Sequence, residues 1–175
     1  MSTKSFNIIV SGGGMVGMAV ANALAQSDFK IAVIESREPQ NFDINQDYDL
    51  RVSAVTLETV DFLKTMDVWD SVIETRTCPL KAMRVWEESG FGDVTFDAKT
   101  IGEDNIGYIV ENRILQLALW EKAESDANIK IFCPETHKNI YVDNDQVEVT
   151  LSNGEKIYSK LLVGADGAKS SIREQ

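Results

Sequence analysis

The chain has 175 residues, of which 43% are hydrophobic, so it carries enough apolar material for one ordinary globular core. Its formal net charge of −11 argues against a nucleic-acid-binding surface or a patch for anionic membranes in this segment. No apolar run approaches the roughly 20 residues of a membrane helix, and no apolar export core precedes the first predicted strand. We therefore expect a cytoplasmic protein.

The cysteines and the single histidine do not form a recognisable reactive site. Cys78 and Cys133 match no metal-binding or redox spacing, and we interpret them as reduced, buried thiols. His137 lies in a polar stretch before a predicted strand, and we interpret it as a surface residue. Without a second histidine, neither a metal site nor a Ser-His-Asp triad is expected.

The first predicted elements are a strand, a glycine-rich turn, a helix and a second strand. A short apolar strand over Asn7–Val10 leads into the turn, and apolar residues then recur at helical spacing, at Val16, Val20 and Leu24. The second strand, from Ile31, ends in Glu35, about 18 residues after Gly17.

Each glycine of this turn has a separate predicted role in holding a dinucleotide. Gly12 permits the tight turn, Gly14 lets a pyrophosphate approach the backbone, and Gly17 lets helix and strand pack closely. The helix start directs amide groups at the phosphates, and Glu35 can accept both ribose hydroxyls but would repel a 2′-phosphate. The pattern favours FAD or NAD over NADP; an ordinary glycine turn is the alternative interpretation.

The middle of the chain predicts a long loop followed by mixed elements. Ser36–Arg51 is polar and rich in turn residues. The elements expected after it are one helix through Leu57, Val60 and Leu63 that extends to Met66 and Trp69, strands at 82–88 and 94–96 around a turn at 90–92, a strand at 106–110, a helix containing Leu115 and Leu119, and a strand at 129–132.

The last third predicts an antiparallel meander and one more buried strand. Val147, Val149 and Leu151 alternate with polar residues, and turn sequences flank them, which indicates three antiparallel strands from about Asn139 to Tyr158. Leu161–Val163 then resembles a buried parallel strand. We predict an α/β fold whose parallel sheet has the strand at 129 beside the one ending at Glu35, and the strand at 161 on the other side of the first strand.

A second motif, Asp166-Gly167, follows that last strand. It lies at the carboxyl end of a central strand, beside the first turn, where ligands of open α/β sheets bind. A glycine at position 167 permits a positive φ and a close approach to a ligand. The alternative is an Asp-Gly turn without a role.

Together these residues resemble the class A flavoprotein aromatic hydroxylases, related to para-hydroxybenzoate hydroxylase. Within them the sequence is most similar to the ubiquinone-biosynthesis hydroxylases. The resemblance rests on "GGGMVG", Glu35, "DLRVSAVT" around Arg51, "ENRILQLAL" from Glu111, and "GADGAKSSIR". It covers essentially the whole chain but only the first part of a family member. It implies a Rossmann-like FAD-binding domain with a β-meander crossover. We interpret residues 1–175 as this one domain in incomplete form.

The resemblance assigns cofactor-binding roles to nine residues, while Arg173 is expected to support the second motif. The glycines of the turn would bind the FAD pyrophosphate, Glu35 the adenosine ribose, and the Asp-Gly pair both the pyrophosphate and visiting NAD(P)H. Arg51 would lie by the cofactor, with a solvated loop arginine as the alternative, and Asn112 and Gln116 would face it, with a plain helix N-cap as the alternative for Asn112. The nine are Gly12, Gly14, Gly17, Glu35, Arg51, Asn112, Gln116, Asp166 and Gly167.

Three positions depart from the usual family pattern. Ser11 stands where glycine or a small apolar residue is usual, Asp28 where a glycine commonly ends the first helix, and Lys169 where asparagine or another small residue is frequent. None of them blocks the fold, but Lys169 affects the expected phosphate contacts.

The implied activity is hydroxylation of an aromatic ring, that of a prenylated phenol or quinol in ubiquinone biosynthesis, with NAD(P)H and O2 as co-substrates and a flavin C4a-hydroperoxide as the oxygen donor. Because the cofactor carries the difficult step, no catalytic side chain is nominated. A non-catalytic FAD- or nucleotide-binding fragment and an NAD-dependent dehydrogenase are the alternatives.

The chain alone, which stops at Gln175, is expected to bind FAD weakly and to hydroxylate nothing. We expect any peripheral membrane contact to come from a C-terminal part that this chain lacks. The apolar edge that such a part would cover favours self-association.

Overall fold

The computed structural model describes residues 4–174, and the chain forms two compact units. The first unit contains the described residues up to Asn41 and from Gln116 onward, and the second unit is Phe42–Leu115. One junction lies inside the long loop and the other inside a helix, α5 (Asn112–Ser125). A boundary inside a continuous loop or helix leaves no change of pattern in the sequence.

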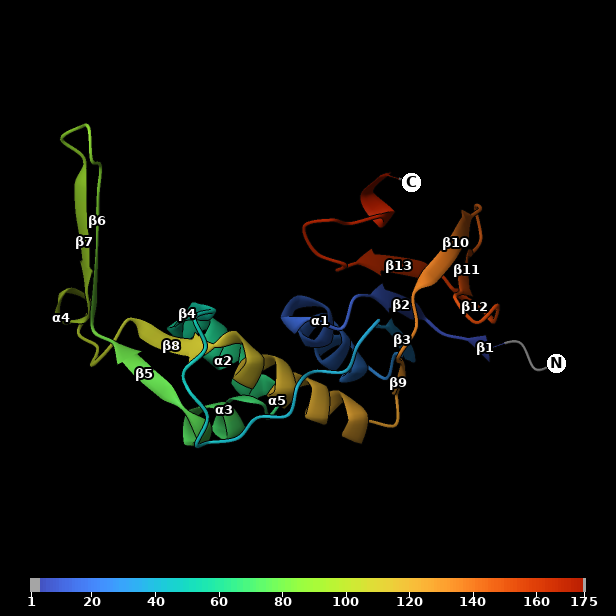
Figure 1. The fold of residues 1–175 in the computed structure, drawn as a ribbon, viewed down its shortest axis with the longest axis horizontal. Coiled ribbons are helices and arrows are strands. Elements are labelled where there is room, and N and C mark those ends of the chain that lie inside the picture. The colour runs from blue at the N-terminus through green and yellow to red at the C-terminus, as the bar shows by residue number, and fades with distance from the viewer. Residues whose placement is uncertain (1–3, 175) are drawn as a thin grey trace. The chain divides into compact units, whose positions relative to one another are not determined.

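A parallel sheet is the centre of the first unit (Figure 1). Its strand order is β13-β2-β3-β9, and all neighbours are parallel, which confirms the predicted sheet and the predicted places of its outer strands. The two central strands are buried along their whole length, and α1 packs against β2, β3 and β9. The bounds are β2 Ile8–Ser11, α1 Met15–Ala25, β3 Ile31–Ile34, β9 Ile129–Phe132 and β13 Leu161–Gly164.

The predicted meander is present between β9 and β13. Its strands β10, β11 and β12 pair antiparallel in that order, and a two-residue strand that the sequence did not predict, β1, pairs parallel with β12. The apolar face of β11 packs into the same core cluster as Ile9 and Ala32 of the parallel sheet. The bounds are β1 Lys4–Ser5, β10 His137–Val142, β11 Val147–Leu151 and β12 Lys156–Ser159.

The second unit is built on a three-stranded antiparallel sheet in the order β4-β8-β5. The predicted strand at 106–110 is its central strand, whereas β4 and β5 were not predicted. β5 contains Pro79, which has no N–H to donate and is tolerated because β5 is an edge strand. The bounds are β4 Val52–Thr56, α2 Leu57–Thr65, α3 Trp69–Thr75, β5 Thr77–Leu80, β6 Ala82–Trp86, β7 Asp93–Asp97, α4 Ala98–Ile101 and β8 Gly107–Glu111.

The single helix predicted through Leu57 and Trp69 is wrong, because two helices, α2 and α3, take its place. The chain leaves α2 when Asp67 adopts a left-handed conformation with φ of 55°, and the N–H of Val68 bonds back to the carbonyl of Leu63 at 3.1 Å. This break buries Val68 and Trp69 together, and the Trp69 ring packs 5.1 Å from that of Tyr108. Burial of both side chains therefore decides the break.

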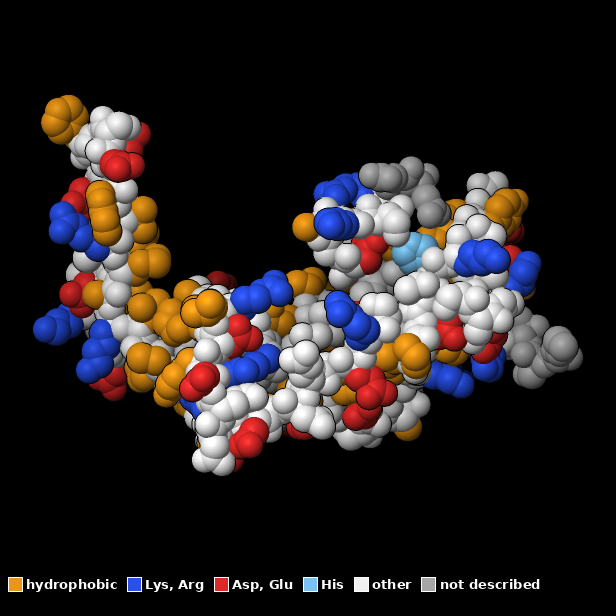
Figure 2. Space-filling model, viewed as in Figure 1, with side chains coloured by type: hydrophobic (Ala, Val, Ile, Leu, Met, Phe, Trp, Pro, Cys, Tyr) orange, Lys and Arg blue, Asp and Glu red, His pale blue; other side chains and the backbone are white. Residues whose placement is uncertain are grey.

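Strands β6 and β7 form the predicted hairpin and expose most of their side chains. Hydrophobic side chains gather along it in the space-filling view (Figure 2), and those on the two strands and their turn are Met83, Val85, Trp86, Phe91, Val94 and Phe96. Cys78 on β5 is also exposed, so its prediction as a buried thiol is wrong; an edge strand leaves that side chain open to solvent. Cys133 is half-buried, and both thiols are free.

Within residues 4–174 no helix is long and apolar enough to cross a membrane. The same described residues contain no group of three or more histidine, cysteine or acidic side chains that could hold a metal ion.

Candidate functional site

The glycine turn after β2 is held by backbone contacts on both sides. The N–H of Gly12 donates to the Ile34 carbonyl at 2.8 Å, and the N–H of Ala165 donates to the Ser11 carbonyl at 2.8 Å. Gly12 has a φ of +109°, and a Cβ added to it would lie 2.3 Å from the Ala165 carbonyl oxygen. The Asp-Gly motif therefore begins in direct contact with the first turn, as the sequence predicted.

Two further glycines are required by close packing. A Cβ on Gly17 would lie 1.9 Å from the carbonyl oxygen of Gly12. A Cβ on Gly13 would lie 2.9 Å from the side chains of Glu35 and Trp120. No role was predicted for Gly13, although its place as the middle of three consecutive glycines was a signal that could have indicated one.

The space beside Gly14 is open, in contrast to its neighbours. No atom lies within 4 Å of a Cβ built on it, and Gly14 is the residue that precedes the first turn of α1. The first amides of a helix have no acceptor within the helix, and the helix dipole is positive there. An anionic group can therefore approach both the Gly14 backbone and the N-terminus of α1.

Glu35 is anchored at the end of β3 by three donors. Its Oε2 accepts the N–H of Gly13 at 2.6 Å, and its Oε1 accepts the Ser36 hydroxyl at 2.8 Å and the N–H of Arg37 at 3.0 Å. A carboxylate can accept about four hydrogen bonds, so capacity for a ligand hydroxyl remains. The charge is thereby fixed beside the glycine turn.

Gln116 also contacts this turn. Its side-chain amide donates to the Gly13 carbonyl at 3.3 Å, from the part of α5 that belongs to the first unit. A second polar side chain joins the helices behind the turn: Asn22 of α1 donates to the Leu119 carbonyl of α5 at 2.9 Å. The predicted Gln116 is therefore brought next to the predicted glycines.

The Asp-Gly motif closes the other side of the turn. Gly167 has a φ of +83°, which favours glycine, and the Arg173 guanidinium donates to the Ala168 carbonyl at 3.0 Å. Asp166 Oδ2 accepts the N–H groups of Ser171 at 2.9 Å and Ile172 at 3.4 Å. Its Oδ1 is buried and has no hydrogen-bond partner among the described residues. A buried acceptor without a partner is costly unless a ligand or water supplies a donor.

Burial alone would raise the pKa of Asp166. Hydrogen bonds from the Ser170 hydroxyl and from the backbone N–H groups of Ser171 and Ile172 outweigh burial and hold this pKa below its ordinary value. The carboxylate therefore remains charged at neutral pH.

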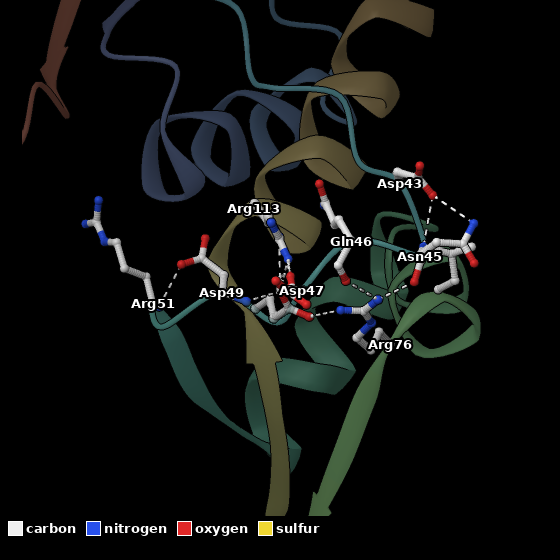
Figure 3. Close-up of polar contacts among 10 residues, drawn as sticks. Asp43, Asn45, Gln46, Asp47, Asp49, Arg51, Arg76 and Arg113 are labelled. Atoms are coloured by element: carbon white, nitrogen blue, oxygen red, sulfur yellow. Dashed lines mark hydrogen bonds and ion pairs between the residues drawn. The ribbon is translucent and has the colours of Figure 1, made fainter.

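Arg51 and Asn112 belong to the second unit and are linked there. The N–H of Asn112 donates to the Arg51 carbonyl at 3.0 Å, and the Ser53 hydroxyl donates to Asn112 Oδ1 at 2.6 Å. The Arg51 side chain is exposed and points away from the cluster formed by Arg76 and Arg113 (Figure 3). The Asn112 side chain therefore ties the start of α5 to β4.

That arginine cluster holds the second half of the predicted long loop, residues 42–51. Buried Glu111 accepts from Arg76 at 3.2 Å, from Arg113 at 2.6 Å and from the N–H of Asp49 at 2.7 Å (Figure 3). Arg76 also donates to the carbonyls of Ile44 and Gln46, and Arg113 to that of Asp47. None of the three anchors was predicted from the sequence: Glu111 and Arg113 entered only as part of the "ENRILQLAL" motif, and Arg76 was not singled out.

The electrostatics of Glu111 follow from the same contacts. Burial would raise the pKa of Glu111, but the Asp49 N–H and the two guanidinium groups outweigh it and lower this pKa below its ordinary value of 4.5. The 42–51 loop is therefore anchored by a charged carboxylate.

The prediction of His137 as a surface residue is wrong. The ring is half-buried, and both of its nitrogens have partners, Ser11 Oγ at 3.2 Å and Ser171 Oγ at 2.8 Å. The reason is tertiary: His137 begins β10, and the fold brings Ser11, 126 residues away in sequence, and Ser171, 34 residues away, to the two nitrogens of its ring.

A family model described as "FAD binding domain" matches residues 5–175 of this chain. The chain belongs to the FAD-binding domain family. It is 38% identical over 174 residues to 3-demethoxyubiquinol 3-hydroxylase of Escherichia coli (strain K12), an alignment that covers 99% of this chain and 44% of that protein. It is 31% identical over 191 residues to the mitochondrial ubiquinone biosynthesis monooxygenase COQ6 of Dictyostelium discoideum, covering 97% of this chain and 39% of that one. The chain thus spans less than half the length of these relatives.

Solved structures show the same fold. PqsL of Pseudomonas aeruginosa, described as a probable FAD-dependent monooxygenase, superposes with a TM-score of 0.75 over 98% of this chain and 45% of its own, at 16% identity. These comparisons confirm the resemblance to class A flavin monooxygenases of the ubiquinone-hydroxylase type and the Rossmann-like α/β fold.

Proposed function

We propose that the protein is an FAD-dependent monooxygenase that hydroxylates an aromatic ring, that of a prenylated phenol or quinol in ubiquinone biosynthesis, and consumes NAD(P)H and O2. The observation that carries the FAD assignment is the contact between Gly12 and Ala165, which joins the start of the Asp-Gly motif to the glycine turn. The similarity to ubiquinone-biosynthesis enzymes supports the reaction class and the substrate class.

The residues of the first unit fit an FAD molecule on three counts. The space beside Gly14 and the N-terminus of α1 suit a pyrophosphate. Glu35, already held by three donors, offers its remaining acceptor site to a ribose hydroxyl. Asp166 Oδ1 needs a donor, which a hydroxyl group of the cofactor would supply.

The chain's own residues bind and orient the cofactor in this proposal. FAD, when bound, supplies the reduction and oxygenation chemistry, and no side chain of this chain is assigned a catalytic step. Gly167 and Gln116 shape the backbone around the ligand. Arg51 and Asn112 are proposed cofactor contacts as well.

Cofactor identity is tested by extracting the ligand from the purified protein. We expect FAD. Gly14→Val would place a branched side chain in the open space, and Glu35→Ala would remove charge-assisted hydrogen bonds of roughly 1.5–3 kcal/mol each. Both changes should weaken FAD binding in a fluorescence titration. Recovery of a nicotinamide nucleotide alone, or unchanged FAD affinity in both variants, would contradict the assignment.

The reaction class is tested with a protein that contains this chain and has the length of the relatives, loaded with FAD and mixed with NADH or NADPH, ¹⁸O₂ and a prenylated phenol. We expect substrate-dependent consumption of the reduced nucleotide and one labelled oxygen atom in the product. Oxidation of a substrate without oxygen incorporation would indicate a dehydrogenase. Binding of FAD without any turnover would indicate a binding module.

The cellular location of the protein and the kind of molecule that it acts on are part of the same proposal. Both cysteines are free thiols, which supports a cytoplasmic location. The net charge of −11 supports a small-molecule substrate over a nucleic acid.

A further inference from the structure

The one histidine of the chain bridges the two cofactor motifs. Ser11, which precedes the glycine turn, is the last residue of β2, and only 3% of its surface is exposed. Ser171 follows the Asp-Gly motif and is exposed. The His137 ring lies between them, with Nδ1 3.2 Å from the Ser11 hydroxyl and Nε2 2.8 Å from the Ser171 hydroxyl. Ser11 is one of the positions at which the sequence departs from the usual family pattern.

The direction of these hydrogen bonds follows from the group at the end of the series, the Asp166 carboxylate. Asp166 is a carboxylate and can only accept, and its Oδ2 takes the Ser171 N–H at 2.9 Å and, at the long distance of 3.5 Å, the Ser171 hydroxyl. The Ser171 oxygen is then free to accept a proton from His137 Nε2. That tautomer leaves Nδ1 as an acceptor for the buried Ser11 hydroxyl. This single arrangement of donors and acceptors satisfies the whole chain of contacts.

This arrangement determines how the Asp166 carboxylate is turned. Because Ser171 and Ile172 occupy Oδ2, the other oxygen, Oδ1, stays buried and without a partner among the described residues. If the Ser171 segment moved, the carboxylate could rotate and exchange the roles of its two oxygens. The ring of His137 is the contact that ties that segment to the end of β2.

We propose that His137 is a positioning residue that holds the Ser171 segment against Ser11 and thereby directs Asp166 Oδ1 at a hydroxyl donor of the bound dinucleotide. This inference rests on the proposed FAD site. It gives Ser11 a role as well: its hydroxyl sets the tautomer that lets Nε2 donate to Ser171.

Two amide substitutions separate the two sides of the bridge. His137→Gln can place its terminal amide near the position of Nε2 and keep the Ser171 contact, whereas His137→Asn reaches only the position of Nδ1 and keeps the Ser11 contact. His137→Phe keeps the ring and loses both hydrogen bonds. The dissociation constant for FAD is measured by flavin fluorescence on the full chain, beside the urea unfolding of each protein without FAD.

We expect His137→Phe and His137→Asn to weaken FAD binding about ten-fold, the size expected for the loss of one well-placed hydrogen bond. We expect His137→Gln to stay within about two-fold of the unsubstituted protein. In an Asp166→Asn background, adding His137→Phe should cause no further loss, because the residue that His137 positions is already altered. A role in folding alone would change the urea midpoints and leave the three FAD constants equal.

Ser171→Ala keeps the test valid if a histidine variant does not fold, because Ser171 is exposed and its removal leaves the core intact. We expect it to weaken FAD binding several-fold. Equal FAD affinity in Ser171→Ala and in all folded histidine variants would overturn the inference while leaving the FAD site standing. Failure of the unsubstituted protein to bind FAD would overturn the proposed function, and with it this inference.

Discussion

The glycine turn after β2 and the 42–51 loop are both irregular segments, but different forces hold them in place. The turn is fixed by backbone hydrogen bonds and by contacts so close that a Cβ on Gly12, Gly13 or Gly17 would fall within 3 Å of another atom. The 42–51 loop is fixed by guanidinium groups that donate to its carbonyls and by the buried carboxylate of Glu111. Steric fit is insensitive to pH, whereas a charge cluster is not. The two segments should therefore respond differently to substitution and to acid.

Gly17→Ala should give the largest effect, because its Cβ would meet a backbone oxygen at 1.9 Å, which can be relieved only by moving the turn. We expect a loss of about 3 kcal/mol or more in the free energy of unfolding, at the upper end of overpacking effects. Urea denaturation measures it. The matched control is Gly14→Ala, which has open space and should cost less than about 1 kcal/mol. Equal stability of the two variants would show that the packing argument is wrong.

Glu111→Gln should give the next largest effect, in the other segment. It leaves two guanidinium groups without a counter-charge, and such breaks cost about 3–5 kcal/mol when the pair is fully buried. Because the Arg113 side chain is 24% exposed, we expect about 2–3 kcal/mol. The control is Asp61→Asn, which breaks the exposed ion pair with Lys64 and should change stability by less than about 0.5 kcal/mol. Similar effects of the two substitutions would mean that the cluster does not anchor the loop.

Acid should also distinguish the two segments. The pKa of Glu111 is lowered in the folded protein, so the unfolded chain binds this proton more readily, and the stabilisation is present above pH 4.5 and is lost as pH falls through the lowered pKa. The difference in unfolding free energy between the unsubstituted protein and Glu111→Gln should therefore shrink below pH 4.5. The penalty of Gly17→Ala should stay constant over the same range. A Glu111→Gln difference that is flat with pH would contradict the assignment of the charge.

Ser53→Ala should give the smallest of these effects. It removes the 2.6 Å hydrogen bond to Asn112 Oδ1 that ties the start of α5 to β4, which we expect to cost about 1 kcal/mol. Thermal unfolding followed by circular dichroism can resolve a change of this size. No change would indicate that water replaces the serine hydroxyl.

Much of the first unit could be predicted from sequence because its strands are continuous or alternating apolar runs. Ile31–Ile34 and Val147–Leu151 carry that signal within four or five residues, and their places in the sheets followed from it. The second unit was predicted less well. β5 contains a proline and β4 has only one buried residue, so neither shows the pattern of a buried strand.

The residues of the candidate site also differ in how well the sequence predicted them. Gly12, Gly17 and Glu35 were found because their requirements are local: a turn, a helix start and a strand end follow one another in sequence. Gly13, Glu111 and His137 were missed or misinterpreted because their partners come from distant segments, such as Trp120 for Gly13 and Arg76 for Glu111.

The sequence by itself determined the glycine turn, the position of Glu35 and the parallel sheet that presents them, because the spacing of glycines, apolar residues and one acid encodes local geometry. Only the tertiary structure decided that the chain turns at Asp67 after α2, so that Trp69 can be buried, and that one imidazole joins Ser11 to Ser171. The physical reason is that burial and hydrogen bonding are satisfied by whichever groups the folded chain brings together. For His137 and Ser11, those groups are 126 residues apart.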